Sequence, residues 1–297
     1  MICVLEFYAG LGGLQAACST AATVVQAVDI NSHARNVYAA NFATPYTIKE
    51  IETLTASWIT GTGANTWWLS PPCQPFTRRG AQADLNDSRT RSLLHLVHRI
   101  PECLPQHIFL ENVLGFQSSA TCEVLLKTLN DHHYRYQWFQ VCPSELGWPN
   151  RRPRIYLVAT QDCPSGLPGS LTPRENIYSK CVADLLEDEA NERQELFLAD
   201  YELNFLSGMD RIEDPKDRNS CTACFGSSYG KSYLHAGSVL RVGNRYRRFS
   251  PREVARLMGF PDSYQLLPSL SNRQLWKLLG NSLSLPAVQW VLRHSFS

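Results

Sequence analysis

The sequence predicts an α/β protein with a doubly wound, mostly parallel, Rossmann-like sheet and a smaller second lobe. Apolar runs of strand length alternate with helix-length segments through about residue 160, which is typical of such a sheet. The first run, ICVLEF, ends in the glycine-rich turn YAGLGG, and a second apolar run closes on Asp29. Strand, glycine turn, helix, strand and acidic residue in this order open a nucleoside-binding α/β unit.

The remaining elements follow from apolar runs and their periodicity. Ser32 is expected near the N-cap of the second helix, and Pro101 is expected to break the third. Two further strands are expected around a turn near residue 150. The predicted strands lie at 2–7, 23–29, 65–70, 107–112, 136–147 and 154–160, and the predicted helices at 14–21, 31–42, 92–104 and 121–132.

Three segments are expected along the chain. Residues 1–161 form the predicted cofactor-binding and catalytic domain, and residues 162–244 form a looser lobe rich in proline, serine and glycine. The acidic run at 184–195 is interpreted as a helix with a solvated face. Residues 245–297 show strong helical periodicity and are expected to return to the first domain.

Composition restricts the class of protein. A chain of 297 residues with 44% hydrophobic residues can bury a sizeable core. Its ten cysteines lack the spacing of a disulfide-rich module, which favours a reduced, intracellular protein, and no apolar stretch has the length of a signal or membrane segment. Because the net charge is +1, nucleic-acid binding must come from local clusters.

The glycine turn indicates the kind of cofactor. Gly10, Gly12 and Gly13 do not have the GxGxxG spacing that cradles a pyrophosphate. This favours S-adenosylmethionine over NAD or FAD. Asp29, at the end of the second strand, is positioned to accept both ribose hydroxyls of a bound nucleoside.

Two candidate catalytic residues follow later strands. Cys73 comes directly after Pro71 and Pro72, which restrict the backbone and give a nucleophile a rigid mount, although a buried structural thiol is the alternative. Glu111 ends the run HIFLEN at the same predicted edge. In a partly apolar pocket its carboxyl stays protonated and donates to a ring nitrogen, whereas a strand-end cap or ion pair is the alternative.

Arginines form the candidate nucleic-acid contacts. Arg152 and Arg154 alternate in RRPRIYLV, so we expect them side by side on one strand face, suited to a phosphate or a base carbonyl. The runs TRRG, NRRPR and RVGNRYRRFSPR are further basic clusters, with a solvated basic face as the alternative. Cys221 and Cys224 form a C-x-x-C without a second pair, so no metal site is predicted.

These motifs together resemble a known family. FYAGLGG, PPCQPF, LENV, RRPRIYLVA and LLGNSL stand in the order of the cytosine-5 methyltransferases, from residue 3 to the end of the chain. Within that family the chain resembles the tRNA-aspartate methyltransferase branch, in QPFTRRG, in DLNDSRTRSLLHL and in Cys224-Phe225 before GSVL. Gly226 departs from the threonine that is usual in this branch, which leaves the contacts to tRNA open.

The resemblance implies a class I S-adenosylmethionine-dependent methyltransferase fold and C5 methylation of cytosine 38 in the anticodon loop of tRNA-Asp. Cys73 is the implied nucleophile. Glu111 is implied to donate to N3 of the base, Arg154 to hold the base carbonyl, and Arg152 to help position the loop or a phosphate. The implied cofactor residues are Phe7, Gly10, Leu11, Gly12, Asp29, Ile30, Ile48, Pro71, Asn281 and Ser282. The assigned nucleic-acid residues are Arg78, Arg79, Arg89, Cys224, Phe225, Lys231, Arg245 and Arg247.

Three alternatives stay open. A DNA cytosine-5 methyltransferase would share every catalytic residue, and weak DNA binding is retained as a second partner. A module that binds S-adenosylmethionine and RNA without turnover has no chemical reason to keep the whole catalytic set. An NAD-dependent oxidoreductase lacks its GxGxxG. We expect a monomer without a membrane partner, located in the cytoplasm, with the nucleus left open.

Overall fold

The structure is a computed structural model that describes residues 2–18, 22–77, 84–161, 179–204, 206, 211–231 and 236–295. The chain divides into two compact units. Unit 1 comprises Met1–Val141, Pro153–Thr172 and Val291–Ser297, and unit 2 comprises Cys142–Arg152 and Pro173–Trp290. The domain ranges expected from the sequence, 1–161, 162–244 and 245–297, stay a prediction.

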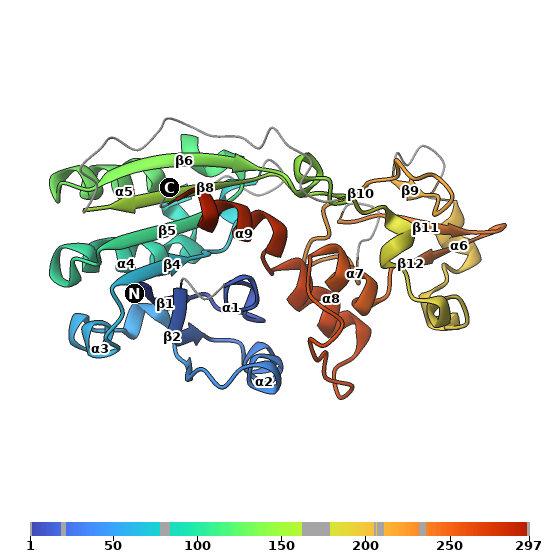
Figure 1. Cartoon of the computed structure of the whole chain (residues 1–297), viewed down its shortest axis with the longest axis horizontal. Helices are drawn as coiled ribbons and strands as arrows, with labels where there is room; N and C mark the ends of the chain where they lie inside the picture. Colours follow the sequence, from blue (N-terminus) through green and yellow to red (C-terminus); the bar gives the residue numbers. More distant parts are fainter. Residues whose placement is uncertain are drawn as a thin grey trace. The chain divides into compact units, whose positions relative to one another are not determined.

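Unit 1 is built on a seven-stranded sheet of order β3-β2-β1-β4-β5-β8-β6. In Figure 1 the strands β6, β8, β5, β4, β1 and β2 follow one another across this unit. β1 to β5 pair in parallel, whereas β8 is antiparallel to β5 and to β6. The predicted doubly wound, mostly parallel α/β sheet is confirmed. The strands are β1 (Ile2–Phe7), β2 (Ala22–Asp29), β3 (Tyr46–Ile48), β4 (Thr66–Leu69), β5 (His107–Asn112), β6 (Arg135–Val141) and β8 (Arg154–Thr160).

This strand order determines where ligands bind. The chain runs from β1 to β2 and β3 in one direction along the sheet, and from β4 to β5 in the opposite direction. The place where the direction reverses is called a switch point. In open α/β sheets ligands bind there, at the carboxyl ends of the strands. The glycine turn follows β1, and the proline-cysteine turn follows β4. Both turns therefore lie at the edge where a binding site is expected.

Two helices of unit 1 bear on the sequence expectations. α2 begins after Asn31, whose Oδ1 accepts the N–H groups of His33 and Ala34, so Asn31 is the N-cap and Ser32 lies next to it, as expected. α4 is not broken at Pro101, because this proline lies in its last turn, where a missing N–H removes only one helical bond. The helices are α1 (Gly13–Ala17), α2 (Ser32–Asn41), α3 (Ala56–Gly61), α4 (Arg91–Cys103) and α5 (Ala120–Asp131), with 3-10 helices η1 (Ile51–Thr53), η2 (Gln74–Phe76), η3 (Asp84–Asn86), η4 (Ser88–Thr90) and η5 (Leu114–Ser118).

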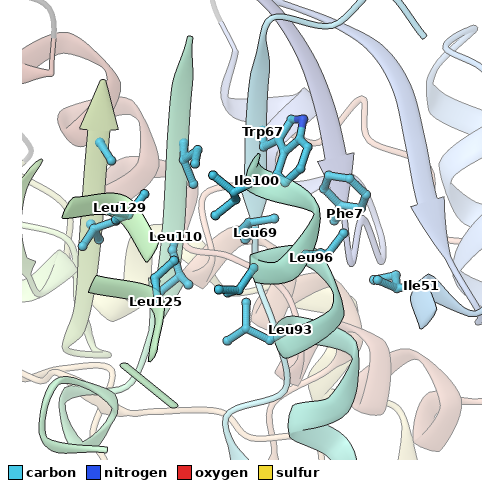
Figure 2. Close-up of a cluster of buried hydrophobic side chains, with 14 of the residues drawn as sticks. Phe7, Ile51, Trp67, Leu69, Leu93, Leu96, Ile100, Leu110, Leu125 and Leu129 are labelled. Carbon is cyan, nitrogen blue, oxygen red and sulfur yellow. The ribbon is translucent and has the colours of Figure 1, made fainter. Parts of the chain in front are cut away.

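A large hydrophobic core of unit 1 lies between the sheet and α4 and α5. Figure 2 shows Leu93, Leu96 and Ile100 of α4 close to Leu69 of β4. The spacing of three and four residues places these side chains on one helix face, and all of them are fully buried. Burial of this apolar face stabilises the sheet whose carboxyl edge carries the candidate site.

Unit 2 contains short strands and helices. β7 (Asn150–Arg151) pairs in parallel with β10 (Thr222–Ala223), and a second small sheet has the order β12-β11-β9. The boundary between the units falls within α9 (Leu285–His294). The other elements are η6 (Pro143–Leu146), η7 (Val182–Leu185), η8 (Asp188–Asn191), η9 (Gln194–Leu196), α6 (Asp200–Leu203), β9 (Ile212–Glu213), β11 (Val239–Val242), β12 (Arg245–Arg248), α7 (Pro251–Leu257) and α8 (Asn272–Gly280).

The acidic run at 184–195 does not form the helix that was expected. It lies in the separate 3-10 segments η7, η8 and η9. The Asp184 carboxylate accepts the N–H of Cys181 at 2.8 Å, and Arg193 pairs with Glu187 at 2.6 Å. Such local bonds of side chains compete with a continuous helix. Within the described residues no helix is both long and apolar enough to cross a membrane.

Candidate active site

The glycine turn after β1 has a backbone that favours glycine. Tyr8, Gly10 and Gly12 have φ angles of 58°, 51° and 79°. Glycine adopts this left-handed region readily, whereas tyrosine does so rarely. A Cβ on Gly12 would lie 2.7 Å from the rings of Tyr38 and Phe42, so no larger residue fits there. The turn is therefore compact, and its shape depends on Gly12.

Asp29 connects the end of β2 to this turn. Its Oδ2 accepts the N–H of Gly10 and its Oδ1 accepts the N–H of Asn31, both at 2.9 Å. Burial raises the pKa of the Asp29 carboxyl, and the backbone N–H groups of Asn31, Gly10 and Ile30 oppose that rise. The structure thus brings together the acidic residue and the glycine turn that the sequence singled out.

Two exposed isoleucines lie beside this carboxyl. Ile30 and Ile48 have 63% and 48% of their surface exposed, unusually high values for large aliphatic residues. Ile48 is the cross-strand partner of Asp29, and Ile30 follows it directly. Apolar surface next to a carboxylate fits a nucleoside, with the base on the aliphatic side chains and the ribose hydroxyls on the carboxylate. The residues present therefore fit the adenosine of S-adenosylmethionine.

Phe7, a predicted cofactor residue, can contact a cofactor only through its backbone. Its ring is fully buried and packs edge-on against Trp67, with ring centroids 5.5 Å apart, so its side chain belongs to the core. Leu11 is also buried, which leaves its backbone for any cofactor contact. Tyr8 was not among the predicted cofactor residues, although it is a half-buried aromatic residue of the glycine turn. Its position directly after the last residue of β1 could have indicated that it belongs to this turn.

Glu6 of β1 is a buried carboxyl next to this site. It is 1% exposed, and Tyr38 donates its hydroxyl to Oε2 at 3.5 Å. Burial raises the pKa of Glu6 to about 8, and the negative charge of Asp29 adds to the rise. Glu6 therefore favours the neutral form in the folded chain at neutral pH.

A pH-dependent stability follows from Glu6. Below its ordinary pKa of 4.5 the carboxyl is protonated in the folded and the unfolded chain, and its stabilising contribution is lost as the pH rises through about 8. We expect the free energy of unfolding of the native protein to fall over this window relative to Glu6→Gln, which stays neutral. Urea titrations between about pH 5 and about pH 9 measure the difference. Parallel profiles of the two proteins would contradict it, and exposed Glu102→Gln is the matched control.

The proline-cysteine turn follows β4. Asn112, at the end of β5, donates its Nδ2 to the carbonyl of Pro71 at 3.3 Å, which ties the turn to the neighbouring strand. Cys73 is the N-cap of η2, and its carbonyl accepts the N–H of Phe76 at 3.0 Å. The Cys73 side chain is only partly buried. The thiol is thus mounted on a turn that is fixed at both ends.

Gly115 holds the other side of this turn. A Cβ at Gly115 would lie 2.3 Å from the carbonyl oxygen of Phe76. The rings of Phe76 and Phe116 also meet edge to face, with centroids 5.0 Å apart. Since backbone packs directly on backbone, a side chain at position 115 would displace the turn that carries Cys73.

Glu111 and Arg154 form an ion pair at the same edge. The Nε of Arg154 lies 3.1 Å from Oε1 of Glu111, and both side chains are about nine-tenths buried. Arg154 can reach it because β8 runs antiparallel to β5 and begins where β5 ends. Glu111 thus lies against a guanidinium group, which corrects the partly apolar pocket expected from the sequence and matches the ion-pair alternative.

Arg152 does not lie beside Arg154 on one strand face, because β8 begins at Arg154 and Arg152 belongs to unit 2. Its side chain is buried and donates to backbone carbonyls of unit 2. This use of the guanidinium corrects the expectation of a phosphate contact and fits a role in holding loops. The acceptors are Phe225 at 3.0 Å, Gly280 at 3.3 Å, Ser282 at 2.6 Å and the Cys224 sulfur at 3.2 Å.

The motif LLGNSL lies at the end of α8 in unit 2. Asn281 is the C-cap of α8 and is exposed, whereas Ser282 is buried. The Ser282 hydroxyl has no hydrogen-bond partner among the described residues. A buried polar atom of this kind requires a partner, and a bound polar ligand would supply one. The residue therefore fits its predicted place in a cofactor site.

The predicted nucleic-acid residues divide by exposure. Lys231, Arg89 and Arg245 are exposed, and the guanidinium of Arg245 lies 3.6 Å from the centre of the Phe197 ring. Arg78 and Arg79 lie outside the described residues, and Cys224 contacts Arg152.

Two of these predictions need correction, because the side chains are buried within unit 2. The Phe225 ring is 1% exposed and packs edge to face against Tyr229 and Phe249. Arg247 is fully buried and forms two 2.7 Å bonds with the Glu253 carboxylate. Neither side chain is available to stack on a base or bind a phosphate.

The strand order of unit 1, with one antiparallel strand beside the edge strand β6, is that of class I S-adenosylmethionine-dependent methyltransferases. The carboxylates and the thiol at its carboxyl edge fit a reaction on a nucleobase. The family described as C-5 cytosine-specific DNA methylase matches residues 2–296, and the chain belongs to this family. The protein is a cytosine-5 methyltransferase, as its motifs predicted.

Similar proteins support this assignment over nearly the whole chain. A DNA (cytosine-5)-methyltransferase of Dictyostelium discoideum is 30% identical over 98% of this chain and 93% of that protein. The tRNA (cytosine(38)-C(5))-methyltransferase of Homo sapiens is 30% identical over 98% of both proteins. The crystal structure of S. pombe Dnmt2 methyltransferase superposes with a TM-score of 0.84 at 29% identity, over 98% of this chain and 96% of that one.

Proposed function

We propose that this enzyme methylates C5 of cytosine in RNA, at position 38 in the anticodon loop of tRNA-Asp, through a covalent bond between Cys73 and C6 of the base. The arrangement at the ends of β4 and β5 carries the proposal. The hydrogen bond from Asn112 to Pro71 joins the turn of the thiol to the strand that ends on Glu111 and Asn112. A nucleophile and an acid–base group are thereby mounted on adjacent strands.

The chemistry needs both groups. Cytosine C5 is too weakly nucleophilic to take a methyl group directly, so the Cys73 thiolate bonds to C6 and the ring electrons move toward C5. Glu111 donates a proton or hydrogen bond to N3, and Arg154 binds the base carbonyl. S-adenosylmethionine, when bound, would supply the methyl group and leave as S-adenosyl-L-homocysteine. Loss of the C5 proton and cleavage of the bond between sulfur and C6 then regenerate the thiolate and release 5-methylcytosine.

The ion pair between Glu111 and Arg154 suggests how the base is received. Glu111 and Arg154 contact each other in place of the atoms of the base that each is proposed to bind. Entry of the base exchanges this pair for two new contacts: Glu111 takes up a proton from solvent and donates it to N3, and Arg154 donates to the base carbonyl. Such an exchange keeps both buried groups hydrogen-bonded before and after binding, which avoids an unpaired buried charge.

The choice of RNA rests on relatives and on charge. The human relative is named for cytosine 38 of tRNA. A net charge of +1 gives no strong general attraction to duplex DNA. A base in a loop also leaves its stack at lower cost than a base in a duplex. Exposed Lys231 and Arg245 remain candidate RNA contacts, and a monomeric, cytoplasmic enzyme stays part of the proposal.

The competing proposal is a DNA substrate, which the name of the Dictyostelium relative favours. Transfer of radiolabelled methyl from S-adenosylmethionine to unmodified tRNA-Asp and to duplex DNA, measured in parallel, separates the two. We expect label in tRNA only, and none in a tRNA-Asp whose cytosine 38 is replaced. Label in DNA alone would keep the chemistry and overturn the substrate.

Asp29→Ala is expected to weaken S-adenosylmethionine binding about 10- to 100-fold, because a charge-assisted hydrogen bond contributes about 1.5–3 kcal/mol. The variant also loses the two N–H contacts that hold the glycine turn. Calorimetric titration measures the affinity, and thermal unfolding shows whether the chain stays folded. Asp131→Ala is the matched control, since Asp131 is exposed and forms an ion pair with exposed Lys127 at 2.5 Å. Unchanged affinity in Asp29→Ala would remove Asp29 from the cofactor site.

A further inference from the structure

Tyr8 links the glycine turn to a segment far along the chain. Its hydroxyl donates to Oγ of Ser92, in the first turn of α4, at 3.0 Å. Burial raises the pKa of Tyr8 above its ordinary value of 10.0, so the hydroxyl keeps its proton and stays a donor. The Ser92 hydroxyl donates in turn to the carbonyl of Arg89 at 3.5 Å. The turn that is expected to hold the cofactor is therefore hydrogen-bonded to residues 89–92.

The position of the Tyr8 side chain depends on the shape of the glycine turn. Tyr8 has a φ of 58°, in the left-handed region that tyrosine rarely adopts. The N–H of Ala9 binds the carbonyl of Val28 at 3.0 Å, which fixes the next residue of the turn. The Tyr8 ring packs against the hydrophobic core of unit 1. A ligand that holds this turn therefore also holds the Tyr8 hydroxyl.

The segment 84–92 is held at its other end as well. The Asp84 carboxylate accepts the N–H groups of Ala120 and Thr121, in the first turn of α5, at 2.5 and 3.1 Å. The Asp84 carbonyl accepts the hydroxyl of Thr90 at 3.2 Å. Because α5 follows β5 and Tyr8 follows β1, the segment extends between the ends of these two strands. β4, which carries the Cys73 turn, lies between them in the sheet.

This segment presents positive charge at the carboxyl edge of the sheet. Arg89 and Arg91 are both exposed, and the guanidinium of Arg89 pairs with Asp87 at 2.5 Å. Exposed arginines suit the phosphates of a nucleic acid. Ordering their backbone before the nucleic acid binds lowers the cost of binding.

We propose that Tyr8 is a positioning residue for the reaction: its hydrogen bond to Ser92 transmits the presence of the cofactor at the glycine turn to residues 84–92 and so prepares this segment for RNA. The inference rests on the proposed function, which supplies the cofactor and the RNA. Coupling between two ligands is reciprocal, so RNA on the segment also favours the cofactor. One neutral hydrogen bond can carry only its own free energy, which corresponds to about a two- to tenfold effect.

Amide hydrogen exchange tests this link without any nucleic acid. The native protein and its variants are compared with and without S-adenosyl-L-homocysteine, at concentrations that calorimetric titration shows to be saturating. Tyr8→Phe keeps the ring and loses only the hydroxyl, whereas Ser92→Ala removes the acceptor. Tyr46→Phe is the matched control, because the Tyr46 hydroxyl donates to the carbonyl of Gly10, in the same turn, at 3.4 Å.

The exchange is followed at the N–H groups of Thr90 and Arg91, which bind the carbonyls of Asp87 and Ser88. We expect S-adenosyl-L-homocysteine to slow this exchange by about two- to tenfold in the native protein and in Tyr46→Phe. The slowing should be lost in Tyr8→Phe and in Ser92→Ala. The double variant should behave like either single variant, since both remove the same bond.

Binding of tRNA-Asp to the same proteins gives a second readout. We expect S-adenosyl-L-homocysteine to raise the affinity of the native protein for tRNA by about two- to tenfold, and to leave that of Tyr8→Phe unchanged. A residue with a purely structural role would lower the affinity with and without the cofactor product alike. The ratio of the two affinities therefore separates coupling from general damage to the fold.

The exchange result decides the proposal. Equal slowing in the native protein and in Tyr8→Phe would overturn it, and so would a saturated native protein without any slowing. Should Tyr8→Phe fail to fold, Ser92→Ala gives the same decision. If the exchange result holds but tRNA does not bind, the RNA substrate of the proposed function is wrong, whereas the link from the cofactor turn to residues 84–92 is supported.

Discussion

Cys73→Ala is expected to lower methyl transfer to tRNA by about a thousandfold or more, while S-adenosylmethionine binding is retained. Without the thiolate no bond to C6 forms, so C5 stays too weak a nucleophile. The cofactor residues at the ends of β1 and β2 do not depend on this side chain. Single-turnover methyl transfer and calorimetric titration measure the two quantities. The matched control is Cys103→Ala, which removes a partly buried thiol at the end of α4.

A fluorine at C5 of the target cytosine tests the covalent bond itself. Fluorine cannot leave C5 as a cation, so the adduct with Cys73 cannot be resolved after methylation. We expect native protein and fluorinated tRNA to form a complex that survives a denaturing gel, and Cys73→Ala to form none. A stable complex with Cys73→Ala would assign the nucleophile to another residue.

Arg247→Met is expected to lower the free energy of unfolding by about 3–5 kcal/mol, the range for breaking a buried ion pair by removing one partner. Arg247 and Glu253 are both fully buried, and Glu253 also accepts the N–H groups of Glu187 and Ser250. The substitution leaves the carboxylate with these two neutral donors. Urea titration followed by circular dichroism measures the change.

Arg245→Met is the matched control for this prediction, because Arg245 lies two residues earlier on β12 but is exposed. We expect a change within about 1 kcal/mol, as for exposed charged contacts. Adding Glu253→Gln to Arg247→Met should recover part of the loss, since glutamine is neutral and still accepts the N–H groups. Equal losses for the two arginines would show that the buried pair does not stabilise the chain.

The sheet and its edge could be predicted from the sequence, because the strands of a parallel sheet are buried on both faces and appear as apolar runs. Asp29, Cys73 and Glu111 each follow or end such a run. The carboxyl ends of parallel strands meet at one edge, so these residues could be placed together before any coordinates were known. Their catalytic and binding roles remain predictions.

Burial in unit 2 could not be predicted, because it depends on partners far along the chain. In RVGNRYRRFSPR, Arg245 and Arg247 are alike as sequence, yet only Arg247 meets a carboxylate, supplied by α7. Arg152 likewise takes acceptors more than 70 residues away, which no local pattern indicates. The sequence did indicate where α7 begins, because Ser250 and Glu253 have the spacing of a capping box, which marks the start of a helix.

The pairing of Val141 with Arg154 has a consequence for how the chain tolerates changes in length. The last residue of β6 and the first residue of β8 are cross-strand partners, so the sheet fixes both ends of the connection formed by residues 142–153. The entropy of closing such a loop grows only with the logarithm of its length. A change of length within 142–151 therefore costs little closure entropy at the sheet and leaves Arg154 in register with Val141, but it acts on η6 and on β7, which pairs with β10.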